Sequence, residues 1–186
     1  MGILKPHKPS DYPSVLLYIL DETHITVTLT TALAILYTRD AHVIWFAAGA
    51  LNSSLSAKLL KNLIRNPRPP PPDASSKPSK IRPKRTYGMP STHSTALTFY
   101  FVYLIPLVRY LPFPLDWIAA LGVGGYWVLG LWSRKELGYH TWEQVLGGAL
   151  YGTLLALGWK AAYIRYPSIG ATIQRVVDVV WGRIFG

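Results

Sequence analysis

Long apolar segments separated by polar, charged stretches dominate this sequence. A membrane-spanning helix needs about 20 mostly apolar residues to cross a hydrocarbon core about 30 Å thick. Five segments reach or approach this length: His24–Thr38, Ala41–Leu60, Thr95–Leu111, Leu115–Leu131 and Val145–Tyr163. Backbone polar groups inside a bilayer must bond within their own segment, which a helix allows. We therefore predict an all-α fold, a polytopic membrane helix bundle with about five transmembrane helices.

The five segments differ in how well their length and composition suit a membrane span. The second and fifth are long enough, and Gly148 and Gly152 in the fifth are spaced for close helix contact. The first, His24–Thr38, is short and rich in threonine. We expect it to recruit residues upstream of Asp21–Glu22 or to span a locally thinned bilayer. Three further glycines predict tight packing of the fourth segment: Gly122, Gly124 and Gly125.

The C-terminal residues show a different pattern. An apolar helical stripe lies opposite Gln174, Arg175 and Asp178 and consists of Ile169, Ile173, Val176, Val177, Val180, Trp181 and Ile184. This pattern predicts an amphipathic helix, at the membrane interface or packed on the bundle. We therefore divide the chain into an integral membrane domain, residues 1–166, and an amphipathic C-terminal tail, residues 167–186.

The charge balance points to an anionic partner. The formal net charge is +10, and the chain has no cysteine, which excludes disulfides. A soluble nucleic-acid binder has no need of long apolar segments. We therefore predict anionic lipid, and not nucleic acid, as the partner.

Three short polar strings stand at the ends of the predicted spans, and the topology places all three on the same face of the membrane. They supply three cations, a hydroxyl and two imidazoles: Lys61, Arg68, Arg134, Ser91, His93 and His140. Cleavage of a phosphate without a metal needs cations for its oxygens, a nucleophile and a proton donor. Clustered carboxylates and Cys/His ligand spacings are lacking. We therefore predict a phosphate-handling site with neither metal nor cofactor.

Each string alone also has a structural explanation. The basic residues around Lys61 could anchor a helix end at lipid head groups. Ser91 or Thr92 could cap the helix that follows, although a helix N-terminus is itself an anion site. His140 could simply be the start of a helix. Arg68 is harder to explain this way, because its flanking prolines restrict where its guanidinium can reach.

In this order and spacing, the strings resemble the three motifs of the type 2 phosphatidic acid phosphatase superfamily. They match Lys-x6-Arg-Pro from Lys61, Pro-Ser-x-His from Pro90 and Ser-Arg-x5-His from Ser133. The resemblance spans roughly Ala41 to Tyr163. The stretches 88–94 and 139–146 look most like the dolichyl-diphosphatase branch, whose members are small integral proteins of the endoplasmic reticulum with a lumenal active site.

The resemblance implies a role for each motif residue. His140 would be the nucleophile that forms a phosphohistidine, and His93 would protonate the leaving oxygen. The phosphate oxygens would be bound by Lys61, Arg68, Arg134, Ser91 and the backbone N–H of Thr92.

The chain departs from the family pattern at two positions. Thr92 replaces the common glycine of the second motif, which restricts the loop but keeps the N–H. Gln144 replaces the aspartate usually found four residues after the nucleophile, as it does in the dolichyl-diphosphatase branch. A neutral amide stabilises an imidazolium less than a carboxylate does. Glu143 and Gln144 both lie near His140 on the predicted helix, so either could orient the imidazole.

We therefore predict a lipid phosphatase of the endoplasmic reticulum, with a lumenal site, that hydrolyses the terminal phosphate of a polyprenyl (dolichyl) diphosphate. Arg82, Lys84 and Arg85 stand just before the second motif, where a second phosphate could be met. Three alternatives stay open: a phosphatase for a sphingoid-base phosphate or phosphatidate, a phosphotransferase, and a non-catalytic lipid-binding membrane scaffold. The chain-length preference, the membrane orientation and the oligomeric state are also left open, since the basic region Lys58–Arg85 would read as cytoplasmic by the positive-inside rule.

Overall fold

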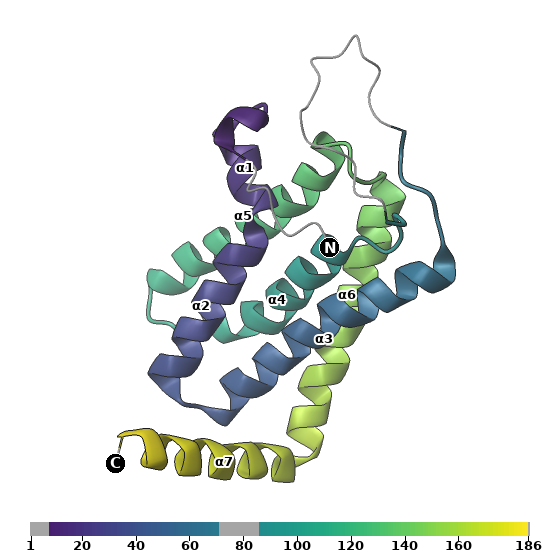
Figure 1. The fold of residues 1–186 in the computed structure, drawn as a ribbon. Coiled ribbons are helices and arrows are strands. Elements are labelled where there is room, and N and C mark those ends of the chain that lie inside the picture. The colour runs from purple at the N-terminus through teal and green to yellow at the C-terminus, as the bar shows by residue number, and fades with distance from the viewer. Residues whose placement is uncertain (1–7, 71–85, 186) are drawn as a thin grey trace.

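The computed structural model describes residues 8–70 and 86–185. Within these ranges the chain forms helices and no strand, which confirms the all-α prediction. The elements are η1 (Pro9–Asp11), α1 (Val15–Asp21), α2 (Thr23–Thr38), α3 (Ala41–Ile64), α4 (Thr92–Val108), α5 (Leu115–Glu136), α6 (Trp142–Arg165) and α7 (Pro167–Phe185). Helices α2 to α6 form a bundle, and α7 lies across one end of it (Figure 1). The hypothesis that Arg82, Lys84 and Arg85 meet a second phosphate lies outside the described residues.

Every predicted span is a helix. α3 and α6 have 24 residues and α5 has 22, and these three are long and apolar enough to cross a membrane. α1 and α2 meet that criterion only together, with a bend of 56° between them, so upstream residues do join the first segment. α4, with 17 residues, is a shorter apolar helix. Within the described residues, length and composition thus support three spans, or four with the bent pair, of the five predicted.

Side-chain caps fix where the helices around the polar strings begin. Ser91 is the N-cap of α4 and accepts the backbone N–H of Ser94. Thr141 caps α6 and forms a reciprocal capping box with Gln144. α3 ends at Ile64, and its C-cap Arg65 has a left-handed φ of 53°. These boundaries bring the C-terminal ends of α3 and α5 to the N-terminal ends of α4 and α6.

Glycines bring α4 and α6 into close contact. A Cβ atom on Gly148 would lie 2.6 Å from the Ser91 carbonyl oxygen, and one on Gly152 would meet the backbone of Thr95. The predicted close contact is therefore confirmed. The prediction for α5 was wrong, because within the described residues nothing lies within 4 Å of a Cβ built on two of its glycines, Gly122 and Gly125. Gly122 and Gly125 lie on a face of α5 that meets no described neighbour, whereas Gly130 of the same helix packs against Leu97 of α4.

Helix α7 packs on the end of the bundle opposite the polar strings, as Figure 1 shows. Its Val177 is buried. Gln174, which the periodicity placed on the polar face, contacts the residues at the start of α3. Its side-chain oxygen accepts the N–H of Ala41 at 2.9 Å, and its amide donates to the Arg39 carbonyl at 3.1 Å. The first N–H groups of a helix lack partners within it, and Gln174 satisfies one of them for α3.

Candidate active site

The three polar strings meet at one end of the bundle, as predicted. They border a cavity of about 810 Å³. Six of the predicted residues line it: Lys61, Arg68, Thr92, His93, Arg134 and His140. Lys61 and Arg134 are almost fully buried, so their charges act in a medium that screens them poorly.

The hydrogen bonds around His140 determine which ring nitrogen carries the proton. The Gln144 side-chain NH₂ donates to the Pro67 carbonyl at 2.7 Å and to Asn66 Oδ1. A carbonyl oxygen can only accept, so the other end of this amide, Oε1, faces His140 Nδ1 at 3.2 Å. Nδ1 must therefore be the donor, which leaves the lone pair on Nε2. Arg68 Nη1 lies 3.3 Å from Nε2, and because a guanidinium only donates, this contact requires the same tautomer.

The environment of His140 keeps its ring neutral. Burial, and then the charges of Arg68 and Lys61, lower the pKa of His140 to about 3. The hydrogen bond with Gln144 raises the pKa but is outweighed. An unprotonated Nε2 facing cations is the state that a nitrogen nucleophile needs.

Arg68 is held by three groups. Its Nε donates to the Thr86 carbonyl at 2.7 Å and its Nη2 to Thr86 Oγ1 at 3.0 Å. Its Nη1 donates to the Tyr139 carbonyl at 2.8 Å. The guanidinium is therefore fixed beside His140, as the restricted backbone between two prolines led us to expect.

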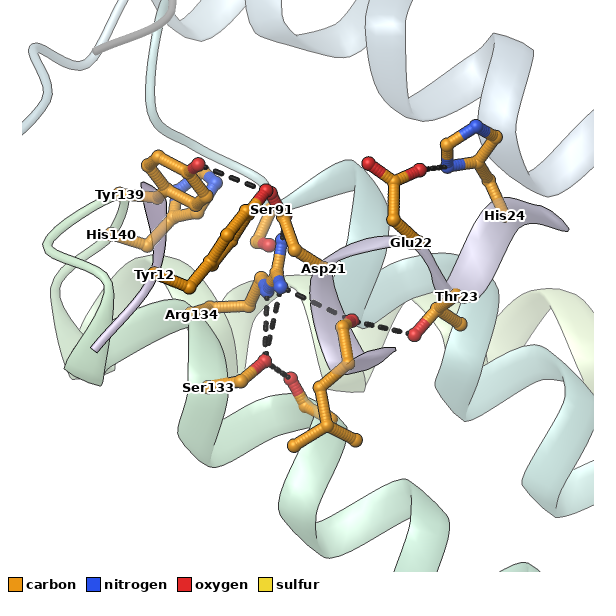
Figure 2. A network of polar contacts seen from close by, with 12 residues as sticks. Tyr12, Asp21, Glu22, Thr23, His24, Ser91, Ser133, Arg134, Tyr139 and His140 are labelled. Carbon is orange, nitrogen blue, oxygen red and sulfur yellow. Dashed lines mark hydrogen bonds and ion pairs between the residues drawn. The ribbon is translucent and has the colours of Figure 1, made fainter. Parts of the chain in front are cut away.

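Arg134 is held by an acidic residue that the motifs did not indicate. Its Nη1 lies 2.6 Å from Asp21 Oδ1, and the side chains are 2% and 8% exposed. Asp21 stands at the junction of α1 and α2 (Figure 2). One signal could have identified it: an acidic side chain inside an otherwise apolar stretch is usually paired and functional.

The remaining predicted residues take different places. Ser91 is fully buried, its oxygen accepts the Ser94 hydroxyl at 2.9 Å, and it caps α4 without being among the described residues that line the cavity. Gln144, and not Glu143, is the residue that contacts His140. Glu143 is exposed and is not among the described residues that line the cavity. Sequence reasoning also missed Thr86 and Tyr139, which only long-range contacts bring to Arg68.

Beyond the charged end, the cavity continues as an apolar gallery between three helices. Its walls are mostly apolar or small: Val27, Thr28, Thr31, Ala32 and Ile35 of α2; Ala47, Ala50, Leu51 and Ser54 of α3; Ala96, Leu97 and Tyr100 of α4. From Ala47 to Lys61 the gallery follows α3 for roughly 20 Å, at a rise of about 1.5 Å per residue. One cavity thus joins clustered cations to a long apolar surface.

Comparison with known proteins identifies the family. The family description "PAP2 superfamily" matches residues 42–166, two thirds of the chain and all three polar strings. The chain belongs to the PAP2 superfamily. The resemblance drawn from the motifs is thereby confirmed, while Asp21 and helix α7 lie outside the PAP2 match.

The curated relatives that this chain resembles include dolichyldiphosphatases. The chain is 32% identical over 160 residues to dolichyldiphosphatase 1 of Homo sapiens, a match that covers 80% of this chain and 64% of the relative. It is 33% identical over 123 residues to the dolichyldiphosphatase of Saccharomyces cerevisiae, which covers 63% and 50%. A lipid phosphate phosphatase epsilon 1, chloroplastic, of Arabidopsis thaliana is 26% identical over 136 residues, covering 67% and 42%. The chain thus spans just under two thirds of the length of several mammalian dolichyldiphosphatases that it matches.

A solved PAP2 structure supports the fold. The transmembrane PAP2-type phosphatidylglycerolphosphate phosphatase from Bacillus subtilis superposes with a TM-score of 0.61 at 22% identity, covering 81% of this chain and 74% of that one. Together with its apolar helices, this fold makes the chain an integral membrane protein. Within residues 8–70 and 86–185, no group of three or more His, Cys, Asp or Glu side chains is placed to hold a metal ion.

Proposed function

We propose that this protein hydrolyses the terminal phosphate of a polyprenyl diphosphate. The observation that carries the proposal is a single cavity with His140 and its cations at one end and the apolar gallery beyond. Such a shape suits a phosphate carried on a long apolar chain. The dolichyldiphosphatase relatives support the same substrate class.

His140 acts as the nucleophile. Its Nε2 lone pair attacks the terminal phosphorus in line with the bridging oxygen, so a P–N bond forms as the P–O bond breaks. The electron pair of the broken bond goes to the bridging oxygen, which His93 protonates, and a polyprenyl monophosphate leaves. Water then attacks the phosphorus of the phosphohistidine while His93 takes its proton: a P–O bond forms, the P–N bond breaks and its electron pair returns to Nε2, which releases orthophosphate and restores both histidines.

The cations stabilise the charge that develops on the phosphoryl oxygens. Arg68 Nη1 already lies 3.3 Å from Nε2, so its guanidinium stands beside the position that the phosphorus takes. Lys61 and Arg134 complete the set from the cavity wall. Because the protein holds these groups before substrate arrives, little reorganisation is needed during the reaction.

Preference for a diphosphate follows from an additional cation. Lys58 lies one helical turn before Lys61 on α3 and lines the same cavity. A monophosphate needs only the cations around His140, whereas the second phosphate of a diphosphate can meet Lys58.

We place the enzyme in the membrane of the endoplasmic reticulum with its site facing the lumen. The choice of membrane is supported by the similarity to dolichyldiphosphatases, and the lumenal side follows from the motif resemblance alone. The second candidate function is the same chemistry on another lipid phosphate. The similarity to the plant lipid phosphate phosphatase supports this candidate.

Phosphate release by the purified full chain tests the proposal. The panel consists of a polyprenyl diphosphate, a polyprenyl monophosphate, phosphatidate and a sphingoid-base phosphate, with His140→Ala as the control. We expect the diphosphate to give the highest kcat/KM. Preference for phosphatidate or the sphingoid phosphate would select the second candidate, phosphate passed to an acceptor other than water would indicate a transferase, and no release from any lipid would contradict catalysis.

A further inference from the structure

Arg134 is held at every nitrogen of its guanidinium. Nε and Nη2 each donate to Ser133 Oγ at 3.1 Å, and Nη2 also donates to the Leu20 carbonyl at 3.2 Å. Nη1 donates to Asp21 Oδ1 at 2.6 Å, the shortest bond of the set. Within the described residues, these partners take four of the five N–H groups. The fifth N–H is on Nη1, and Arg134 lines the cavity.

Asp21 is itself held in place. Its Oδ2 accepts the hydroxyl of Tyr12 at 2.6 Å and that of Tyr139 at 3.1 Å, and Figure 2 shows the tyrosines converging on the carboxylate. Burial, and then the nearby Asp21, raise the pKa of both tyrosines, so both hydroxyls stay protonated and can donate. The carboxylate therefore has a fixed position relative to Arg134.

Charge explains why Arg134 needs this partner. The side chain is 2% exposed, and a buried cation requires a counter-ion or full hydrogen bonding. Arg68 is only partly buried, and the groups that hold it among the described residues are two carbonyl oxygens and a hydroxyl. Of the two acids at the bend between α1 and α2, Asp21 turns towards Arg134, whereas Glu22 pairs with the exposed His24 at 3.6 Å (Figure 2).

We propose that Asp21 is a positioning residue for phosphate binding: it holds Arg134 so that its remaining Nη1 N–H meets a phosphoryl oxygen. This inference rests on one part of the proposed function, namely that Arg134 binds the phosphate of the substrate. It also gives α1, which lies outside the PAP2 match, a role at the site. Removing the carboxylate frees the guanidinium to turn away from the position that the phosphate needs.

A double-mutant cycle tests whether Asp21 acts through Arg134. We would measure the affinity of the purified full chain for orthovanadate, an analogue of the phosphoryl group during transfer. The proteins compared are the wild type, Asp21→Ala, Arg134→Ala and the double variant. We expect Asp21→Ala to weaken vanadate binding by about tenfold to a hundredfold, the range for a hydrogen bond to a charged group. In the Arg134→Ala background, the same change should alter the affinity less than about twofold.

Glu22→Gln is the matched control, because it removes the adjacent carboxylate but leaves Asp21 and Arg134 in contact. It should bind vanadate like the wild type. Asp21→Asn keeps the side-chain shape and serves if Asp21→Ala does not fold; its affinity should fall between those of the wild type and Arg134→Ala. Tighter vanadate binding in Asp21→Asn or Asp21→Ala would overturn the proposal, because Asp21 would then compete with phosphate for Arg134.

An equal loss of vanadate affinity from Asp21→Ala in both backgrounds would also overturn the proposal and assign Asp21 a general structural role.

Lipid turnover separates this inference from the proposed function. If no lipid in the panel releases phosphate while the vanadate cycle behaves as expected, the proposed function fails and the role of Asp21 stands.

Discussion

Gln144 connects two of the polar strings through the two ends of one amide. Its Oε1 lies 3.2 Å from His140 Nδ1, and its NH₂ lies 2.7 Å from the Pro67 carbonyl. The same side chain therefore orients the imidazole and positions the backbone next to Arg68. In this arrangement a neutral glutamine performs both tasks, whereas a carboxylate would repel the Pro67 oxygen.

Replacement of Gln144 should separate its two tasks. Gln144→Leu removes both contacts and should lower kcat/KM by about 10²-fold or more, in the range expected for a misplaced catalytic group. Gln144→Glu keeps an acceptor for His140 Nδ1, and its negative charge should raise the pKa of His140. Activity of Gln144→Glu should therefore decline at a higher pH than wild-type activity does as the solution is acidified. The measurement is kcat/KM as a function of pH for both proteins. If kcat/KM of Gln144→Glu and of the wild type declined at the same acidic pH, this role of Gln144 would be contradicted.

Stability should depend on pH through His140. Its folded pKa is lowered to about 3, whereas an unfolded histidine titrates near 6.5. Between these values the unfolded state binds more protons, so stability rises with pH across the window and this contribution is complete above about pH 6.5. His140→Gln removes the titration. Its melting temperature should fall less than that of the wild type between pH 7 and pH 4.5, and equal falls would show that His140 does not titrate as described.

The gallery should accommodate the lipid chain. Ala47 lines it, whereas the neighbouring Ala48 is exposed and is not among the described lining residues. Ala47→Trp should raise KM for a long-chain polyprenyl diphosphate by about tenfold and leave hydrolysis of a small soluble phosphate ester unchanged, because the charged end stays intact. Ala48→Trp should behave like the wild type on both substrates. Equal losses from Ala47→Trp on both would place the lipid chain elsewhere.

The sequence was sufficient to predict the helices and the convergence of the strings. Apolar length predicts the helices, and Ser91 next to an apolar run predicts a cap. Alternation of helices then brings the three strings to one end of the bundle. These features depend on local pattern and chain order, which a single sequence contains.

Other features depend on tertiary contacts. Asp21 and Arg134 are 113 positions apart, and no local pattern pairs them. Glu143 and Gln144 are both close to His140 on an ideal helix, and the long-range contacts with Asn66 and Pro67 fix the amide of Gln144 against the imidazole. Gly122 and Gly125 of α5 show that small residues permit close packing without specifying a neighbour.

Activity should not require a divalent metal. Lys61, Arg68 and Arg134 provide the positive charge that metal ions supply in other phosphatases. Phosphate release should therefore continue in excess EDTA at the wild-type rate. Loss of activity in EDTA that Mg²⁺ restores would show a metal-dependent reaction and would contradict attack by His140 assisted by cations alone.

The location of the phosphoenzyme tests the central claim most directly. His93→Ala slows proton transfer by about 10²–10⁴-fold but matters less when the leaving group is already acidic. A substrate of that kind should therefore phosphorylate His93→Ala and trap the intermediate, while His140→Ala should not turn over. Mass spectrometry of the trapped protein should find the phosphate on His140. A phosphate on another residue, or an active His140→Ala variant, would contradict the account.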